Sequence, residues 1–389
     1  MRLSSPRVLV GLRAMKLSLL SLLSLVVSLG VNAGEHVYIA CGSGVRMAEF
    51  NDETGVLSET NEAVSIDGAN FLALHPEKPV IYTTCNTDGK KKKKGAIATL
   101  QILENGTLDV LSQSQTKSSG ATHVSVDAAG KVVFTASYGS GSVASFQVEE
   151  DGSLSKAISV VEHEGSSILP SRQSSSHAHY MAAGPKNKFA YVPDLGLDKV
   201  LIYSFEESAE LTAAGAGVVA GGAGPRHMKF SKDGQFAYVL NELNITVTTF
   251  RYDSESGSLT EVATVSAVPE DTDIKRLSCA EIVVHPNGKF VYTSQRDLNA
   301  RDEKDGLGRN SLSVYRVTDE GVLQRIQTIS AGVRIPRNFN LHPSGKWLLA
   351  GGQSSQNVQV FAVDEKTGKL APKGDPVACP GRPMCFVFK

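Results

Sequence analysis

The stretch SKDGQFAYVLNE, residues 231–242, decides the fold because related stretches recur along the chain. Each copy has a turn, usually followed by Lys or Gln, and then a short run rich in Val, Tyr and Phe. The other copies are HPEKPVIYTTCN (75–86), DAAGKVVFTASY (127–138), GPKNKFAYVPDL (184–195), HPNGKFVYTSQR (285–296) and HPSGKWLLAGGQ (342–353). They begin about fifty residues apart, a period that is typical of repeat architectures.

Each repeat shows the same order of predicted strands. A short apolar strand precedes the turn, and the Val, Tyr and Phe run after the turn forms a second strand. A third strand follows a polar loop, and a looser fourth strand ends the unit. The third strands include VLIYSFEE (200–207), TVTTFRYD (246–253), LSVYRVTD (312–319) and VQVFAVDE (358–365).

A four-stranded unit cannot bury both of its faces alone, so it must stack on its neighbours, and radial stacking gives a β-propeller. Six units are complete, and the first, at 36–57, begins at its second strand. The final residues PMCFVFK (383–389) can supply the missing inner strand. We therefore predict an all-β fold, a seven-bladed β-propeller with four-stranded blades, closed by the C-terminal strand. A pair of β-sandwiches is the alternative, but its strands would not repeat the same turn.

The alternating direction of the strands gathers one group of side chains on one face of the ring. The start of the first strand and the end of the second strand of a blade reach the same face. The predicted site residues are His177, His179, Asp194, Arg226, His227, Glu242, Glu281, Arg296 and Arg337, and the same rule adds Asn86, Tyr138 and Gln353. The opposite face collects ordinary turns.

The arginines in this group are suited to a small anionic ligand, since a guanidinium pairs bidentately with carboxylate or phosphate. The alternative is that each arginine forms a structural ion pair. Glu242 could orient or deprotonate a water or a substrate carbon, or it could neutralise neighbouring arginines.

His177 and His179 are two residues apart in SSSHAHYMAAG (174–184) and would point to the same side of an extended strand. They could act as general acid or base, bind substrate, or serve a structural role. A zinc pair is a further alternative, but no third His or Cys follows at suitable spacing. We therefore expect no metal and no cofactor.

Composition and charge narrow the possible partners. The chain has 389 residues, 41% of them hydrophobic, and a formal net charge of -1. This composition is typical of a globular protein. The lack of a global basic field argues against nucleic acid or an anionic membrane as partner, so any anionic ligand must be bound locally. The sequence does not indicate an oligomeric state.

The N-terminus predicts secretion. Residues 15–33, MKLSLLSLLSLVVSLGVNA, place a lysine before an apolar run, with Val31 and Ala33 at the small-residue positions of a cleavage site. We expect a signal peptide at 1–33, a propeller domain at 34–389 and an extracellular, glycosylated product. Asn105-Gly-Thr and Asn244-Ile-Thr are acceptor tripeptides for glycans.

Five cysteines are an odd number for an oxidising compartment, so at least one must stay free or pair between chains. They are Cys41, Cys85, Cys279, Cys379 and Cys385. We interpret them as small buried hydrophobes, with at most one bridge near the C-terminus. Two charged segments, KKKKK (90–94) and LNARDEKDGLGRN (298–310), fall in loops between second and third strands.

Several stretches resemble the lactonase family of seven-bladed propellers, which includes bacterial 6-phosphogluconolactonases and fungal carboxy-cis,cis-muconate cyclases. They are GAGPRHMKF (222–230), FAYVPDLGLDKVLIYSF (189–205), FAYVLNELNITVTTF (236–250), CAEIVVHPNGKFVYTSQRD (279–297) and PRNFNLHPSGKWLLAGGQSSQNVQVF (336–361). The resemblance covers nearly the whole chain after residue 33. The chain departs from the family pattern at the HAH segment, at Gln295 and at Gly351-Gly352.

The resemblance implies a metal-independent enzyme that opens or closes a lactone ring in the central channel. It implies catalytic roles for a histidine of the HAH segment (His177 or His179) and for Arg226, Glu242 and Arg296. The other charged residues that strand alternation brings to this face are our expected substrate contacts: Asp194, His227, Glu281 and Arg337. We expect a secreted lactone hydrolase of the 6-phosphogluconolactonase type that acts on an acidic sugar lactone. The alternatives are a muconate-type cycloisomerase and a non-catalytic propeller that binds carbohydrate or protein.

Overall fold

The computed structural model describes residues 1, 35–87, 94–298 and 309–389. The chain divides into two units, Met1–Ala33 and Gly34–Lys389, and the fold below is that of the second unit. The predicted signal peptide lies outside the described residues apart from Met1. So do lysines 90–93 and residues 299–308 of the charged segment after Asp297.

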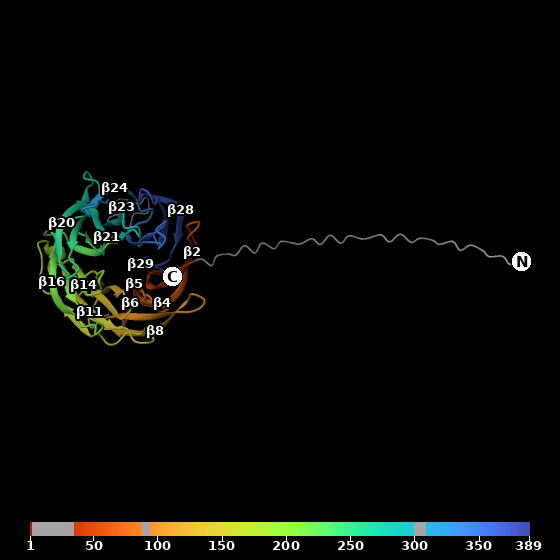
Figure 1. The fold of residues 1–389 in the computed structure, drawn as a ribbon, viewed down its shortest axis with the longest axis horizontal. Helices are drawn as coiled ribbons and strands as arrows, with labels where there is room; N and C mark the ends of the chain where they lie inside the picture. Colours follow the sequence, from red (N-terminus) through yellow and green to blue (C-terminus); the bar gives the residue numbers. More distant parts are fainter. Residues whose placement is uncertain (2–34, 88–93, 299–308) are drawn as a thin grey trace. The chain divides into compact units, whose positions relative to one another are not determined.

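The described strands form seven antiparallel sheets arranged as blades around a central axis (Figure 1). Blade 1 contains β29 (Cys385–Phe388), β1 (Glu35–Ala40), β2 (Gly42–Asn51), β3 (Val56–Leu57) and β4 (Asn61–Ala69). Blade 2 contains β5 (Leu72–Leu74), β6 (Val80–Thr87), β7 (Lys94–Ile102) and β8 (Leu108–Gln115). Blade 3 contains β9 (Ala121–Val126), β10 (Val132–Ser137), β11 (Ser142–Gln147) and β12 (Ser159–Glu162).

The remaining blades repeat the same order. Blade 4 contains β13 (Ala182–Ala183), β14 (Phe189–Asp194), β15 (Lys199–Ser204) and β16 (Thr212–Val218). Blade 5 contains β17 (Pro225–Phe230), β18 (Phe236–Asn241), β19 (Thr246–Tyr252) and β20 (Leu259–Ser266). Blade 6 contains β21 (Leu277–Val284), β22 (Phe290–Asp297), β23 (Ser311–Val317) and β24 (Leu323–Ser330). Blade 7 contains β25 (Pro336–Leu341), β26 (Trp347–Gly352), β27 (Asn357–Val363) and β28 (Leu370–Ala378).

Two short helices, α1 (Pro170–Gln173) and η1 (Ile274–Arg276), lie in connections before blades 4 and 6. Figure 1 shows β5, β21 and β29 near the axis, and β8, β16, β20, β24 and β28 on the outer rim. No helix in the described part of the chain is long and apolar enough to cross a membrane.

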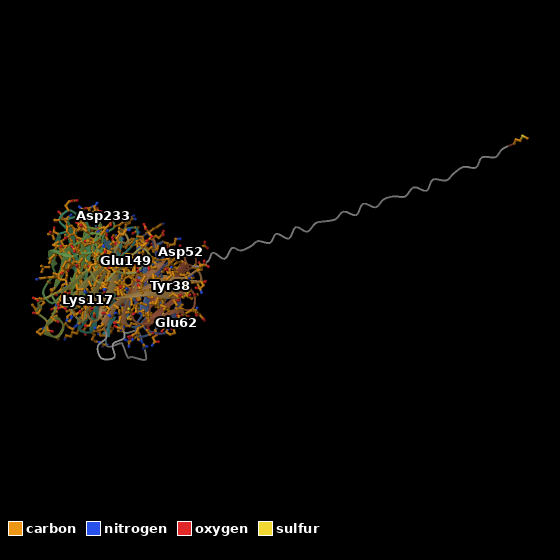
Figure 2. All side chains as sticks on the ribbon, turned by 90° about the horizontal axis from the view of Figure 1, so that it is seen from below. Tyr38, Asp52, Glu62, Lys117, Glu149 and Asp233 are labelled. Atoms are coloured by element: carbon orange, nitrogen blue, oxygen red, sulfur yellow. The ribbon has the colours of Figure 1, made fainter. Side chains whose placement is uncertain are left out.

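The recurring turn has a simple local cause. In residues 231–234, the hydroxyl of Ser231 donates to Oδ1 of Asp233 at 2.6 Å, and Gly234 takes a φ of 68°, which a residue without a Cβ adopts without strain. The main-chain N–H of Gln235 also donates to Oδ1 of Asp233, at 3.1 Å. The turn therefore reverses the chain between β17 and β18. Figure 2 views the ring from its edge and shows Asp233 at one face, at the top in this view.

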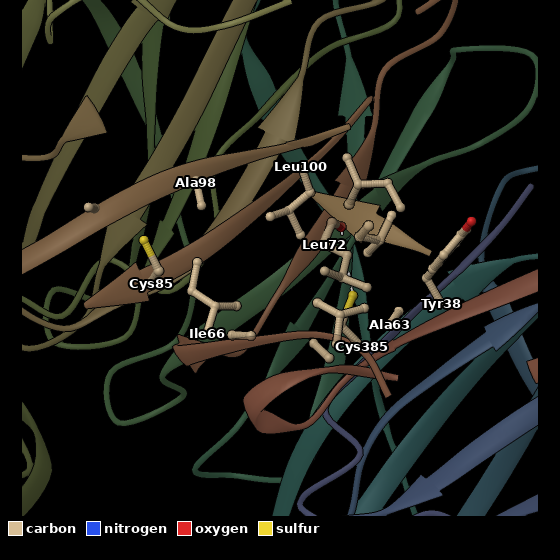
Figure 3. Packing of buried hydrophobic residues seen from close by; sticks show 14 residues of the cluster. Tyr38, Ala63, Ile66, Leu72, Cys85, Ala98, Leu100 and Cys385 are labelled. Carbon is tan, nitrogen blue, oxygen red and sulfur yellow. Dashed lines mark hydrogen bonds between the residues drawn. The ribbon is translucent and has the colours of Figure 1, made fainter. Parts of the chain in front are cut away.

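The blades are held together by hydrophobic clusters, each of which spans two neighbouring blades. The cluster between blades 1 and 2 includes Tyr38, Leu72, Leu100 and Cys385, all nearly inaccessible to solvent (Figure 3). Six further clusters of this kind occupy the other interfaces, among them the one between blades 7 and 1, which includes Phe386. Because each blade buries its faces against both neighbours, the ring is the smallest unit that can bury all of them.

Tyrosines add a repeated hydrogen bond to these interfaces. The hydroxyl of Tyr82 in blade 2 donates to the main-chain carbonyl of Gly152 in blade 3, at 2.9 Å. Equivalent bonds join one blade to the next at Tyr38 and Gly106 (2.8 Å), Tyr191 and Gly257 (2.8 Å), and Tyr292 and Gly368 (2.9 Å). Most buried phenols find such a partner, but the hydroxyl of Tyr238, at the same position in blade 5, has none among the described residues.

The C-terminal strand closes the ring, as the sequence predicts. β29 pairs antiparallel with β1, so that Val37 opposes Phe388 and Ala40 opposes Cys385. A Cβ at Gly351 in blade 7 would lie 2.8 Å from the ring of Phe386, so the departure from the family pattern at this glycine makes room for β29. The predicted seven-bladed propeller with four-stranded blades is confirmed.

Candidate active site

The strand register places the charged side chains at one end of the inner strands. Pro225 pairs with Asn241 in blade 5, so Arg226, the second residue of β17, and Glu242, which follows β18, lie at the same face. In blade 6 the same rule brings Arg296 opposite Ser278.

The carboxylate of Glu242 is the centre of the site because three arginines meet it. Its Oε2 accepts from Nε of Arg226 at 3.0 Å and lies 3.1 Å from Nη2 of Arg296. Its Oε1 accepts from Nη2 of Arg172 at 2.7 Å. Burial alone would raise the pKa of Glu242, but the charges of Arg296 and Arg226 outweigh it and hold this pKa well below its usual range. Glu242 is therefore ionised across the working pH range.

The two deeper arginines are anchored by main-chain carbonyls. Arg226 is 1% exposed, and its Nη1 donates to the carbonyl of Ala280. Arg296 donates through Nη2 to the hydroxyl of Ser278 at 2.6 Å and to the carbonyl of Cys279 at 2.7 Å. Burial and then the charges of Arg337 and Arg296 lower the pKa of Arg226. These contacts fix both guanidiniums before any ligand binds.

His179 is the buried base of the group. It is 4% exposed, and no hydrogen-bond partner of its Nδ1 is found among the described residues. Burial, followed by the charges of Arg226 and His227, holds its pKa well below the usual value for histidine. The ring is therefore neutral at pH 7 and able to accept a proton.

Glu242, Arg296 and His179 line a cavity of about 320 Å³, whereas the predicted catalytic residue Arg226 lies behind Glu242 and lines only a void of about 10 Å³. The residues that line the cavity are Thr122, Tyr138, Arg172, His179, Glu242, Ser278, Arg296, Leu298 and Arg337. Three of them are arginines and one is a carboxylate, so the cavity has an excess of positive charge that favours an anion or a developing oxyanion. The described residues contain no group of three or more His, Cys, Asp or Glu side chains that could hold a metal ion.

Comparison with known proteins gives the family. The family model described as "Lactonase, 7-bladed beta-propeller" matches residues 36–388. The chain belongs to this lactonase family. It is 32% identical over 348 residues to the 6-phosphogluconolactonase of Bacillus subtilis (strain 168), a match that covers 89% of this chain and 94% of the relative.

Other relatives agree with this assignment. The 6-phosphogluconolactonase of Formosa agariphila is 29% identical, with 85% of this chain and 91% of the relative covered. The solved structure of the periplasmic gluconolactonase of Pseudomonas aeruginosa superposes with a TM-score of 0.83 at 25% identity, over 91% of this chain and 98% of the other. A Lactobacillus plantarum protein of known structure also superposes with a TM-score of 0.83, at 28% identity, over 92% and 99% of the two chains.

In this lactonase-family chain, two predicted substrate contacts lie below the cavity. Nδ1 of His227 is 2.9 Å from Oε1 of Glu281, and Nδ2 of Asn338 donates to Oε2 of the same carboxylate at 2.5 Å. Burial raises the pKa of Glu281. His227 lines only a void of about 10 Å³, which has room for about one water. The structure therefore gives His227 and Glu281 a place beneath the site, not the substrate contact expected from the sequence.

Asp194 and His177 also differ from the expectation. Asp194 has no exposed surface, and its carboxylate accepts from the main-chain N–H of His177 at 2.7 Å and lies 2.7 Å from Nδ1 of His163. It holds the loop before blade 4 and has no route to a ligand. His177 stacks on the ring of Tyr138, with centroids 4.4 Å apart, and is not among the residues that line the cavity. Of the two predicted histidines, His179 alone lines it.

Reasoning from the sequence missed Arg172, which lies on α1 and carries the third guanidinium to Glu242. The segment between blades 3 and 4 has no counterpart in the repeat, so the rule for strand ends says nothing about it. The unusual length of this connection, which precedes the HAH segment, was the sequence feature that could have indicated an additional site residue there. Thr122 and Ser278 were missed because short hydroxyl side chains carry no distinctive pattern.

Proposed function

We propose that the protein hydrolyses a lactone of a polyhydroxylated carboxylic acid, in the manner of a 6-phosphogluconolactonase. The observation that carries the proposal is the convergence of Arg172, Arg226 and Arg296 on Glu242, beside the neutral ring of His179. The lactonase family and the relatives named 6-phosphogluconolactonase support the same reaction.

The geometry suggests a division of roles. His179 accepts a proton from water, and the resulting hydroxide attacks the lactone carbonyl. The negative charge that develops on the carbonyl oxygen is stabilised by Arg296 and Arg172, whose guanidiniums line the cavity. The ring C–O bond then breaks, and the proton returns from His179 to the leaving alkoxide, which yields a hydroxy acid. No outside reactant other than water is needed.

Glu242 acts as a positioning residue in this scheme. Both of its oxygens are already engaged by guanidiniums, whereas the ring of His179 has a nitrogen without a partner among the described residues. The charge of Glu242 holds the arginines in place and favours the imidazolium that forms transiently at His179.

The test compares two histidines that are two residues apart. Proton release by the purified protein is followed in a pH-stat with 6-phosphoglucono-1,5-lactone and glucono-1,5-lactone, and spontaneous hydrolysis is subtracted. His179→Gln should lower kcat by about 10²- to 10⁴-fold. His177→Gln, the matched control, should stay within about twofold of wild type, because its ring lies outside the cavity. Wild-type rates equal to spontaneous hydrolysis on both lactones would overturn the proposal.

Two other functions use the same face. A muconate-type cycloisomerase would deliver a proton to a carbon, and it is assayed in parallel by the loss of absorbance of a carboxymuconate. Turnover of the muconate with no lactone hydrolysis would reassign the enzyme. Binding of a sugar acid without turnover of either substrate would instead indicate a non-catalytic propeller.

Secretion is a further part of the proposal, supported by the apolar segment before Gly34. Asn105 is exposed and lies in a turn where its Oδ1 accepts from the main-chain N–H of Thr107 at 3.0 Å, a position open to a glycan. Asn244 is half-buried. N-terminal sequencing of protein from the culture medium should give a start close to Gly34, and an intact Met1 there would contradict secretion by cleavage.

A further inference from the structure

A second and larger cavity adjoins the candidate active site. It has a volume of about 670 Å³, within the range of small-molecule sites. Its lining residues come from blades 1, 2, 3 and 7 and are Cys41, Gly42, Ser43, Asp67, Gly68, Asn70, Asn86, Thr122, Arg337, Gln353, Gln356, Gly381, Arg382 and Met384. Thr122 and Arg337 line both cavities, so a ligand held beside Glu242 can extend past them into the larger space.

The charges of this larger cavity are not balanced. Two arginines line it, Arg337 and Arg382, and neither guanidinium has a hydrogen bond or ion pair to another described residue. The carboxylate that lines it, Asp67, accepts from Nδ2 of Asn86 at 3.1 Å. The neighbouring Glu242 is engaged by three other arginines. For the half-buried Arg337, a guanidinium without an acceptor is costly, and with Arg382 at the outer end of the same cavity this indicates a place for an anion from outside.

The two arginines are placed differently. Arg337 is half-buried at the junction of the cavities, where burial, and then the charge of Arg296, lowers its pKa to about 10, so it is still charged at pH 7. Arg382 is exposed at the outer end, and its main-chain N–H donates to the carbonyl of Cys41 at 3.1 Å, which fixes its backbone beside β1. Amide side chains, among them Asn70 and Gln353, lie on the remaining wall and suit the hydroxyls of a sugar acid.

We propose that the larger cavity is a subsite that binds an anionic substituent, phosphate or carboxylate, at the far end of the lactone substrate. Arg337 and Arg382 are its specificity-determining residues. This inference rests on the proposed lactone hydrolysis. The lactone ring lies beside Glu242 and His179, the hydroxylated chain passes Thr122, and the anion meets the two guanidiniums. Arg382 touches the substituent alone, so it sets substrate preference and takes no part in the chemistry.

The experiment measures kcat and KM for three lactones with Arg382→Gln and Arg382→Lys. The substrates are neutral glucono-1,5-lactone, its 6-phosphate, and a glucarolactone that carries a carboxylate at the same end. Arg382→Gln should raise KM about tenfold for the anionic lactones and leave glucono-1,5-lactone unchanged, since a charge-assisted hydrogen bond contributes about a factor of ten or more. Arg382→Lys should recover part of the loss. An effect confined to the 6-phosphate identifies phosphate, and an effect confined to the glucarolactone identifies carboxylate.

The matched control is Arg251→Gln, because Arg251 is exposed, lies over the ring of Phe236 and lines neither cavity. Equal changes in KM on neutral and anionic lactones would overturn the subsite, while wild-type activity on glucono-1,5-lactone would still uphold lactone hydrolysis.

Thermal melting with the hydrolysed products gives a second readout that needs no turnover. 6-Phosphogluconate or glucarate should raise the Tm of wild type more than that of Arg382→Gln, and gluconate should show no such difference. The same shift in both proteins would also overturn the subsite.

Discussion

Nε of Arg226 donates to Oε2 of Glu242 over 3.0 Å, although the two residues are 16 positions apart, Arg226 on β17 and Glu242 just after β18. Neither side chain is more than 7% exposed. The pair is therefore a buried ion pair, and removal of the Glu242 charge leaves Arg226 buried without its paired carboxylate, whereas Glu242 would keep Arg172 and Arg296.

Glu242→Gln tests this dependence. The neutral amide leaves Arg226 without its counter-charge, so we expect the free energy of unfolding to fall by about 3–5 kcal/mol. The loss of fixed guanidiniums should lower kcat by about 10²-fold or more. Urea unfolding and lactone hydrolysis measure the two effects. Lys188→Ala, which breaks the exposed pair with Glu255, is the control and should cost no more than about 1 kcal/mol. Equal, small effects of both substitutions would contradict a central role for Glu242.

Stability should decrease as the pH falls below 6.5. The pKa values of His123, His179 and His227 are all held low, first by burial and then by neighbouring positive charges. Below pH 6.5 the unfolded chain therefore takes up protons that the folded chain does not, so the free energy of unfolding rises with pH in this range. Each histidine contributes up to about 1.4 kcal/mol per pH unit.

The measurement is urea unfolding at pH 7.5 and 5.5, where we expect a difference of up to about 4 kcal/mol from these three groups. His123→Gln should reduce that difference by removing one of them. His177→Gln should leave it unchanged, because this ring is half-buried and stacks on Tyr138 at the edge of the site. Identical stability at the two pH values would show that the buried histidines carry protons when folded.

The last strand should be indispensable. Deletion of residues 383–389 removes β29, and with it the partner of β1 and the buried ring of Phe386. We expect the truncated chain to be insoluble or to show no cooperative thermal transition.

A circular permutant provides the control for this truncation. The main-chain groups of His36 and Lys389 exchange two hydrogen bonds of 2.8 Å, so the two ends of the described propeller are adjacent. A short linker from Lys389 to Glu35, with new termini in the exposed turn at 254–256, should restore folding. A cooperatively melting truncated protein would refute closure by β29.

Cys41 and Cys379 should form a disulfide under oxidising conditions. All five cysteines are free and buried in the structure, and the sulfur atoms of this pair lie 3.7 Å apart. Refolding with oxidised glutathione should convert the two thiols to one disulfide, with release of two molecules of reduced glutathione. The number of thiols titrated in denaturant should fall from five to three, and the Tm should rise because the link joins the first and last blades. Cys379→Ser should keep four thiols and show no rise, whereas five thiols after oxidation of the wild type would exclude the bond.

The ring and half of the site could be predicted because both follow from strand alternation. The repeated turn fixes where each strand begins and ends, and this alone puts Arg226, Glu242 and Arg296 at one face. The depth of each side chain along the central axis of the propeller could not be predicted from the sequence. Arg226 and His227 both line the void of about 10 Å³ and neither lines the cavity of about 320 Å³, a depth that only the packed structure shows.

The rest of the site comes from segments outside the repeat. Arg172 lies on α1 in a connection, where its position depends on the ion pair that it forms with Glu242. The role of Arg382 in lining the larger cavity likewise depends on where the chain turns before β29. Such positions follow from tertiary contacts, which a single sequence does not display.

The pairing of β1 with β29 also sets an order of events in biosynthesis. Glu35–Ala40 emerges from the ribosome among the earliest propeller residues, yet its inner neighbour is the last strand of the propeller to be translated. Blades 2 to 7 can assemble as the chain lengthens, but the first must wait with one edge unpaired until β29 has been made. The open edge is a site for wrong pairing during this interval. Sequence changes that slow translation of the last blade should therefore lower the yield of soluble protein without altering the folded molecule.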